Sequence, residues 1–312
     1  MSEVGEVIAV DIGGTKIAAA LVDDTDVIRE RLQVDTPGGA PAILSVAAEL
    51  ITTLRSRAEQ FGRRVRAVGV GAPGVIDSAA GVVRSATDIL PGWAGTPIRS
   101  RLADRVGLPV AVANDVRAAA LGAIRDPALH SCPSVLHVSV GTGVGGALLR
   151  YGRPLPGPHA VAGEIAHLLV PAMGALPCGC GRYDHLEAVA AGPAIAAAYA
   201  RMTSAPVLPL TEVAARMRAG EEDATTVIRS AANLLGRTLA GLVAAVDVDA
   251  VTLGGGVVHG ITGFDAAVRE AFHAEALPPL RSVPVLVPRT GADAPLLGAA
   301  QLAREMRNET WV

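Results

Sequence analysis

The pattern that most constrains the fold is a strand, a glycine-rich bend and a second strand, and it occurs twice in the chain. In the first copy, apolar residues 7–10 run into Asp11-Ile-Gly-Gly-Thr-Lys16, and apolar residues 17–22 follow. In the second copy, residues 135–140 run into Gly141-Thr-Gly-Val-Gly-Gly146, and residues 147–149 continue as a strand. Two such hairpins, each opening one half of the chain, predict a duplicated α/β fold of two lobes with a central cleft.

Strands and helices alternate through the rest of the sequence. Apolar spacing predicts helices over residues 41–60, 102–106, 188–202 and 222–246, and strands over residues 65–70, 110–113 and 250–253. This alternation is typical of parallel or mixed sheets with loops at the strand ends. We expect residues 1–116 to form a small first lobe, with 299–312 packing back on it, and residues 117–298 to form the second.

Composition and charge exclude several classes of protein. Half of the 312 residues are hydrophobic, enough for a large core, which excludes a disordered chain. The 30 acidic and 27 basic residues give no basic footprint for nucleic acid. Asp247 and Asp249 interrupt the longest apolar run, so no membrane span is expected. Three cysteines cannot form a disulfide framework, which favours a reducing cytoplasm.

Both glycine-rich bends are candidate phosphate sites. Glycines let backbone N–H groups approach an anion, and a neighbouring carboxylate can hold Mg²⁺ through water. An ordinary hairpin turn is the alternative, but two such bends facing one cleft suit a triphosphate. Neither bend is a P-loop or a dinucleotide-binding fingerprint. The candidate residues are Asp11, Gly13, Gly14, Thr15, Lys16, Gly141, Thr142 and Gly143.

Asn114 and Asp115 follow a predicted strand and precede an Ala-rich segment. The simplest interpretation is a helix cap, a position that these residue types favour. A carboxylate at a rigid strand end could also accept a proton from an alcohol that attacks a γ-phosphate. The two roles are compatible, and spacing alone leaves both open.

His167, Cys178, Cys180 and His185 place four soft or borderline donors within 19 positions. Two thiolates and two imidazoles meet the requirements of a tetrahedral, structural Zn²⁺ site. The alternative is two chance cysteines and two surface histidines. Glu164 and Glu187 flank these ligands, and a loop held by zinc could present both carboxylates to sugar hydroxyls. Two solvated glutamates are the alternative there.

Together these residues resemble the ROK family (repressors, open reading frames and sugar kinases), within the actin-like ATPase superfold, over about residues 6–304. The two bends look like the family's two phosphate motifs, and the turn after Leu253, which comprises Gly254, Gly255 and Gly256, looks like its adenosine-side turn. The most specific match combines Glu164-Ile-Ala-His167 with Cys178-Gly-Cys-Gly181 and Leu186-Glu187.

The resemblance assigns roles to the candidate residues. It implies that Asp115 is the catalytic base and that Asn114 and Gly74 lie on the sugar side. It also implies that Glu164, His167 and Glu187 hold the sugar, with His167 serving zinc as well. The family usually has Gly-Cys where this chain has Asp184-His185, so a histidine would replace one cysteine ligand.

A second departure from the family pattern concerns sugar recognition. Many family glucokinases read Asn-Leu-Pro-Gly-Trp, with the Asn on the sugar, but in Ser85-Ala-Thr-Asp-Ile-Leu-Pro-Gly-Trp93 one more residue separates any such polar side chain from the Trp. Thr87 or Asp88 must then serve. Thr87 resembles the arrangement in N-acetylmannosamine kinases of the family, which favours an N-acylated sugar.

The resemblance therefore implies an ATP-dependent sugar kinase acting on the 6-hydroxyl of a hexose or N-acetylhexosamine, with Mg²⁺, structural Zn²⁺ and a homodimer or dimer of dimers. The sugar, and polyphosphate as an alternative donor, stay open. A sugar-responsive regulator or a non-catalytic sugar-binding module is the competing interpretation. Regulators of the family carry a DNA-binding segment before the first phosphate motif, and only ten residues precede Asp11, so we expect no such domain.

Overall fold

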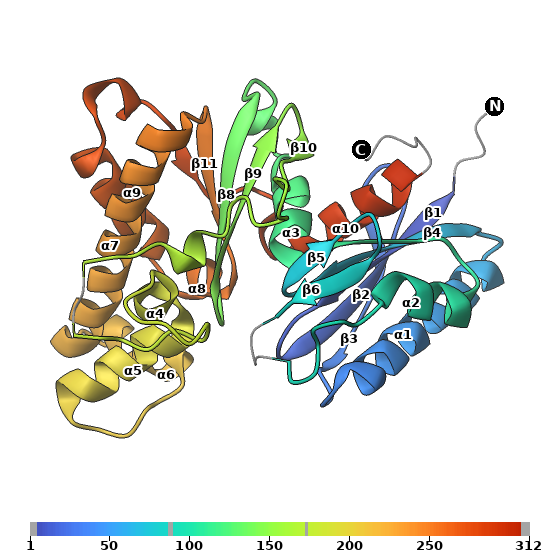
Figure 1. Cartoon of the computed structure of the whole chain (residues 1–312), viewed down its shortest axis with the longest axis horizontal. Coiled ribbons are helices and arrows are strands. Elements are labelled where there is room, and N and C mark those ends of the chain that lie inside the picture. Colours follow the sequence, from blue (N-terminus) through green and yellow to red (C-terminus); the bar gives the residue numbers. More distant parts are fainter. Residues whose placement is uncertain (1–4, 87–89, 172–173, 307–312) are drawn as a thin grey trace. The chain divides into compact units, whose positions relative to one another are not determined.

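The computed structural model describes residues 5–86, 90–171 and 174–306 (Figure 1). Its first sheet has the strand order β3-β2-β1-β4-β7. The first three strands are antiparallel neighbours, and β4 and β7 continue the sheet parallel to β1. The strands are β1 (Glu6–Ile12), β2 (Lys16–Val22), β3 (Ile28–Asp35), β4 (Val65–Ala72) and β7 (Val110–Asn114).

The second sheet repeats this arrangement. Its order is β10-β9-β8-β11-β12, again with two antiparallel neighbours on one side of the first strand and two parallel strands on the other. The strands are β8 (Ser134–Val140), β9 (Val144–Arg150), β10 (Arg153–Pro154), β11 (Ala250–Gly254) and β12 (Val285–Leu286). The predicted duplication is therefore confirmed at the level of strand order and direction.

Helices cover both faces of the first sheet (Figure 1). They are α1 (Ala40–Gln60) and α2 (Ile98–Val106) on one face, and α3 (Asp115–Ala123) and α10 (Ala294–Glu305) on the other. Because successive strand residues point to opposite faces, Ile8 and Val10 pack with α1, whereas Val7 and Ala9 pack with α10.

Glycines allow α10 to lie very close to its neighbours. A Cβ on Gly69 would come within 1.8 Å of the Ala299 carbonyl oxygen, and one on Gly298 within 1.6 Å of the Ala118 oxygen. These distances exclude any side chain. At the end of α10, Arg304 pairs with Asp26, which also pairs with Arg125 after α3.

In the second sheet, one face packs on a helical core. Leu136, Val138 and Leu253 from the strands belong to the same apolar cluster as Leu235 and Phe272 from the helices. The helices of this part are α4 (Glu187–Ala190), α5 (Gly192–Thr203), α6 (Leu210–Arg218), α7 (Glu222–Val246), α8 (Gly256–Gly260) and α9 (Phe264–Glu275). The predicted helix over 222–246 is confirmed.

Short elements complete the described chain. They are the hairpin β5 (Val75–Asp77) and β6 (Val82–Ser85), and the 3₁₀ turns η1 (Pro127–Leu129), η2 (Ile165–His167), η3 (Pro278–Leu280) and η4 (Gly291–Asp293). Among the described residues, no helix combines the length and the apolar character needed to cross a membrane.

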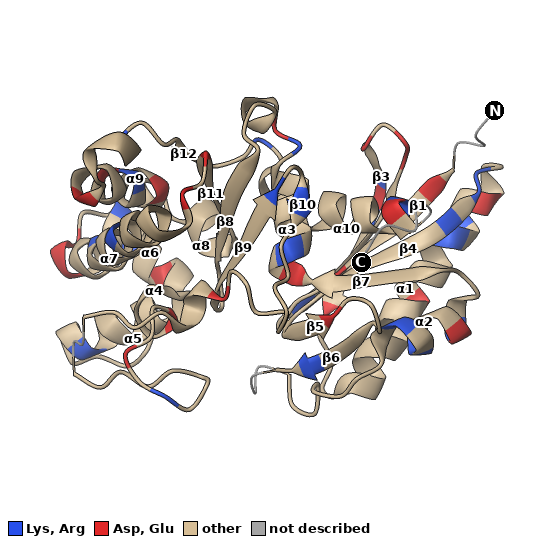
Figure 2. Ribbon diagram, turned by 45° about the horizontal axis from the view of Figure 1, so that its top comes forward, with Lys and Arg blue, Asp and Glu red and all other residues tan. Residues whose placement is uncertain are grey.

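Two features differ from the sequence-based prediction. In place of the single helix predicted over 188–202, the structure has two helices, α4 and α5, separated by Ala191, which is extended with φ −68° and ψ 151°. Pro193, near the start of α5, lacks an N–H and its ring clashes with the preceding helical turn, so one continuous helix cannot form. The strand β3 was not predicted, because three charged residues in succession, Arg29, Glu30 and Arg31, interrupt the alternation of apolar and polar side chains that predicts a strand. Figure 2 shows acidic and basic residues interspersed over the first sheet and its helices.

The chain divides into two compact units. The first comprises Met1–Arg125, Pro156–Val161 and Asp293–Val312, and the second comprises Asp126–Leu155 and Ala162–Ala292. The predicted lobes place their boundary at residue 116 instead. All of α3 falls in the first unit because it packs along α10, where a Cβ on Gly122 would meet the Ala294 oxygen at 1.9 Å.

Candidate active site and metal loop

The candidate residues fall into two groups, one on each unit. In the first unit, the bend between β1 and β2 is closed by the Gly13 N–H, which donates to the Lys16 carbonyl oxygen at 2.9 Å. The Thr36 hydroxyl donates to the Gly13 carbonyl at 2.8 Å. Gly14, Thr15 and Lys16 are exposed at its tip. The bend is thus held at its base and open at its tip, where an anion could reach backbone N–H groups.

Asn114 caps helix α3. Its Oδ1 accepts from the N–H groups of Val116 at 3.0 Å and Arg117 at 3.1 Å, and its Nδ2 donates to the Gly74 carbonyl at 3.0 Å. The helix-cap interpretation is therefore confirmed. The Asn114 side chain also hydrogen-bonds the Asp115 carboxylate, and this contact acts to lower the pKa of Asp115. The bond from Nδ2 fixes Gly74, whose φ of +99° favours glycine.

Asp115 is the first residue of α3, and its carboxylate accepts from the Val116 N–H at 2.8 Å. Burial raises the pKa of Asp115 above its ordinary value, against the lowering effect of that N–H. The carboxylate is oriented by the helix N-terminus and is a stronger base than an exposed aspartate. This combination suits proton acceptance.

Asp11 lies near Asp115 in the same unit. Burial, and secondarily the Asp115 charge, raises the pKa of Asp11 to about 7. Gly71 on β4 lies between them: a Cβ there would be 3.4 Å from the Asp115 Cα and 3.7 Å from Asp11 Oδ1. Sequence reasoning missed Gly71, although a glycine at the end of a buried strand, followed by Ala-Pro-Gly, is a signal of close approach.

In the second unit, three hydrogen bonds fix the bend Gly141–Gly146. The Gly141 N–H donates to the Gly143 carbonyl at 2.8 Å, and the Gly192 N–H donates to the Gly141 carbonyl at 2.8 Å. The Val144 N–H donates to Oε2 of Glu187 at 3.1 Å. Thr142 is exposed at the tip. Sequence reasoning did not predict that Glu187 contacts the bend.

The glycine turn after β11 adjoins this bend. A Cβ on Gly141 would lie 3.8 Å from the Gly256 nitrogen, and one on Gly255 would lie 2.3 Å from the Val140 oxygen. Gly255 also has φ +91°. Beside Gly254 lies His137, bonded through Nδ1 to the Thr252 hydroxyl at 2.9 Å, and burial lowers its pKa to about 4. The structure thus brings the predicted residues 141–143 and 254–256 together.

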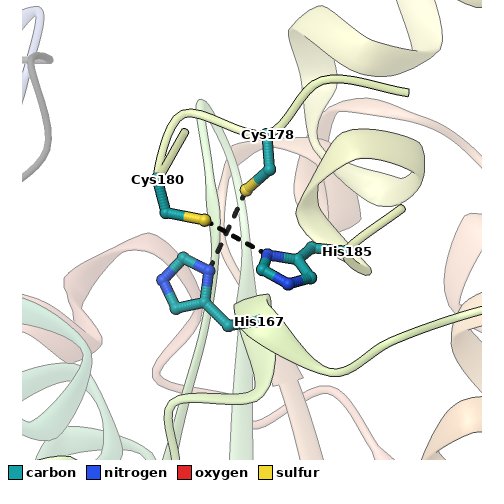
Figure 3. Close-up of side chains that lie close together, drawn as sticks. All are labelled: His167, Cys178, Cys180 and His185. Carbon is teal, nitrogen blue, oxygen red and sulfur yellow. Dashed lines mark hydrogen bonds between the residues drawn. The ribbon is translucent and has the colours of Figure 1, made fainter. Parts of the chain in front are cut away.

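The four predicted metal ligands form one cluster (Figure 3). Their candidate ligand atoms all lie within 4.8 Å of one another. Cys180 Sγ is 3.2 Å from His185 Nδ1, and Cys178 Sγ is 3.9 Å from His167 Nδ1. A tetrahedral zinc with ordinary bond lengths would separate sulfur and nitrogen ligands by about 3.6 Å. The donor set and its spacing therefore fit Zn²⁺.

The segment that contains His167, Cys178, Cys180 and His185, called the metal loop below, also carries the candidate sugar-binding carboxylates. Glu164 directly precedes the 3₁₀ turn η2, which His167 ends. Glu187 begins α4, and its Oε1 lies 3.9 Å from Cys178 Sγ. Isolated bridges between Leu169 and His185 and between Pro177 and Tyr183 hold the loop. The predicted Thr87 lies outside the described residues.

A cavity of about 540 Å³ lies elsewhere in the first unit. None of the candidate site residues lines it. Its lining residues are Gly5, Glu6, Asp23, Asp24, Arg29, Gly62, Arg63, Arg64 and Arg66.

The repeated strand order, with a glycine-rich bend after the first strand of each sheet, defines an actin-like ATPase fold. The chain belongs to the ROK family, whose model matches residues 7–306. The family and the fold class predicted from the motifs are confirmed.

Named relatives align along nearly the whole chain. The glucokinase of Halalkalibacterium halodurans is 30% identical over 322 residues, and the alignment covers 96% of each chain. The N-acetylmannosamine kinase of Pasteurella multocida is 35% identical over 294 residues and covers 94% of both. A crystal structure of a ROK family glucokinase from Streptomyces griseus with glucose and AMPPNP has a TM-score of 0.85 at 31% identity, covering 96% of this chain and all of that one.

Proposed function

We propose that this protein is an ATP-dependent sugar kinase that transfers the γ-phosphate to the 6-hydroxyl of a hexose or N-acetylhexosamine. The observation that carries the proposal is the Asp115 carboxylate, fixed by the Val116 N–H at the start of α3, with a raised pKa and with Asp11 nearby. Its similarity to glucokinases and N-acetylmannosamine kinases supports the choice of sugar as the acceptor.

In this proposal Asp115 is the general base. It orients the sugar hydroxyl and accepts its proton as the oxygen attacks the γ-phosphorus. Asn114, the Gly74 turn and Thr87 contact the sugar. Glu164, His167 and Glu187 hold further hydroxyls, with charge-assisted hydrogen bonds from the two carboxylates.

The nucleotide is held by backbone groups. The bends at Asp11–Lys16 and Gly141–Gly146 bind the phosphates, and the turn Gly254–Gly256 lies on the adenosine side. Asp11 would hold Mg²⁺ through water, and that ion would neutralise charge on the phosphates. The exposed tips of both bends support this assignment.

His167, Cys178, Cys180 and His185 would hold a structural Zn²⁺, which fixes a loop with little core of its own. His167 can serve metal and sugar together, because a metal bond at one ring nitrogen leaves the other N–H free to donate. Fixing this loop fixes Glu164 and Glu187 in place.

The test measures ADP release with Mg·ATP and glucose, mannose, N-acetylglucosamine or N-acetylmannosamine in turn, and repeats the active pair with polyphosphate as donor. We expect turnover with at least one sugar, and phosphorus-coupled NMR of the product should place the phosphate on O6. Turnover with an N-acetyl sugar would support the role of Thr87. Sugar binding by calorimetry without turnover for any sugar and donor would instead indicate a non-catalytic, sugar-responsive protein.

The assembly is part of the proposal. We expect a homodimer or a dimer of dimers in the cytoplasm, acting on small molecules and not on nucleic acid or membranes. Light scattering coupled to gel filtration measures the mass against the 31.6 kDa chain. A monomer at micromolar concentration would contradict this expectation.

A further inference from the structure

Glu187 contacts both the phosphate bend and the metal loop. Its Oε2 accepts from the Val144 N–H at 3.1 Å, and its Oε1 lies 3.9 Å from Cys178 Sγ. It also follows His185 by two residues in the chain. One carboxylate is therefore next to two predicted metal ligands on one side and bonded to the bend on the other.

The bend is shaped to receive this carboxylate. A Cβ on Gly143 would lie 2.6 Å from Glu187 Oε2, so only glycine leaves room for the contact. The N–H of Gly192, at the start of α5, donates to the Gly141 carbonyl at 2.8 Å. The segment that runs from the metal ligands through α4 to α5 thus contacts the bend twice, at Val144 and at Gly141.

Glycine-rich segments lose the most conformational freedom when they become ordered. The bend Gly141–Gly146 contains four glycines, so fixing it for a triphosphate has a large entropic cost. An anchor that fixes the Val144 N–H beforehand lowers this cost. Glu187 can act as that anchor only when its own backbone is fixed, and a metal ion held by Cys178 and His185 would fix that backbone.

We propose that Glu187 is a positioning residue through which Zn²⁺ in the metal loop and a nucleotide triphosphate at the Gly141–Gly146 bend bind cooperatively. The inference rests on the proposed function for the nucleotide site. Because linkage is reciprocal, zinc strengthens nucleotide binding by the same factor by which nucleotide strengthens zinc binding. The Gly141–Gly146 bend, Glu187 and the four metal-loop residues all lie within the second unit. The coupling can therefore be measured without sugar.

The test compares Mg·AMPPNP affinity, measured by calorimetry without sugar, for zinc-loaded and chelator-stripped full-length protein. The ratio of the two dissociation constants is the coupling factor, which we expect to be about tenfold. In Glu187→Ala it should fall to about one while zinc still binds at one ion per chain. Glu187→Gln keeps an oxygen acceptor for Val144 and should retain part of the factor.

Two further variants separate the contact from general damage. Gly143→Ala leaves Glu187 unchanged but displaces its carboxylate, and should also lower the factor. Glu222→Ala removes an exposed glutamate that, like Glu187, is the first residue of a helix, and should keep the wild-type factor. Competition with a chromophoric chelator, with and without Mg·AMPPNP, should return the same factor for zinc.

The outcomes are distinct. Equal nucleotide affinities in loaded and stripped wild-type protein would overturn the coupling and leave the kinase proposal standing. If Glu187→Ala keeps the coupling factor of the wild type, the role of Glu187 is also overturned. The metal would then act only by keeping the loop folded. No nucleotide binding to the zinc-loaded protein would overturn the coupling and the proposed function together.

Discussion

Asp11 and Asp115 are neighbouring carboxylates, one at the end of β1 and one at the start of α3, with the bare backbone of Gly71 between them. Burial and this neighbour raise the pKa of Asp11 to about 7, and burial raises the pKa of Asp115 as well. Two carboxylates that each disfavour ionisation of the other suit a site in which one binds a cation and the other accepts a proton.

Asp115→Asn should lower kcat by about 10²- to 10⁴-fold, because the amide keeps the shape of the side chain but cannot accept the proton. Sugar affinity, measured by calorimetry, should change little. Asp104→Asn, at an exposed aspartate of α2, is the matched control and should behave as wild type. A kcat of Asp115→Asn within a few-fold of wild type would show that Asp115 is not the general base.

Asp11 should make stability depend on pH in the absence of Mg²⁺. The pKa of Asp11 is about 7 in the folded state, against an ordinary value of 3.8. At pH values between these two, the folded state therefore keeps a proton on Asp11 that the unfolded state has lost. The contribution of Asp11 to the free energy of unfolding should therefore fall as pH rises from about 4 to about 7, and level off above.

The variant Asp11→Asn removes this titration. Its Tm at pH 8 without Mg²⁺ should exceed that of wild type, and its loss of Tm between pH 5.5 and pH 8 should be smaller, as thermal unfolding at both pH values would show. Added Mg²⁺ should raise the wild-type Tm more at pH 8 than at pH 5.5, because the cation binds the ionised form. The same pH slope in both proteins would contradict the assignment.

Gly255→Ala should weaken nucleotide binding and destabilise the protein by roughly 1–3 kcal/mol, since φ +91° strains any other residue. The new Cβ would also meet the Val140 backbone, which precedes the phosphate bend. Gly260→Ala, in the same short helix region but facing open space, is the control. Urea unfolding and Mg·AMPPNP calorimetry measure both effects, and equal behaviour of the two variants would show that the turn is not constrained.

His185→Ala should lose the bound metal, and His185→Cys should retain it, because a thiolate can replace imidazole at tetrahedral zinc. Metal content by mass spectrometry and Tm with and without chelator provide the measurements. His159→Ala, at an exposed histidine outside the cluster, should keep one zinc per chain. Full zinc occupancy in His185→Ala would mean that His185 is not a ligand.

The repeated hairpins and the family could be predicted from the sequence alone, and so could the four His and Cys residues that the structure brings into one cluster. Glycine-rich bends after apolar runs, and Cys and His at short spacing, are local patterns whose chemistry does not depend on distant residues. The helix over 222–246 was also predictable, because its apolar residues recur at helical spacing. The exposed edge strand β3 was not, since its residues give no such signal.

Which distant residues meet depends on the tertiary structure. The place of Gly71 between Asp11 and Asp115 depends on the order of β1, β4 and β7 in the sheet. The bond from Val144 to Glu187 joins residues 43 positions apart, and the membership of α3 in the first unit depends on its packing against α10. Periodicity reports which face of an element is buried, but strand order and helix packing, which follow from burial of the whole core, determine what each face meets.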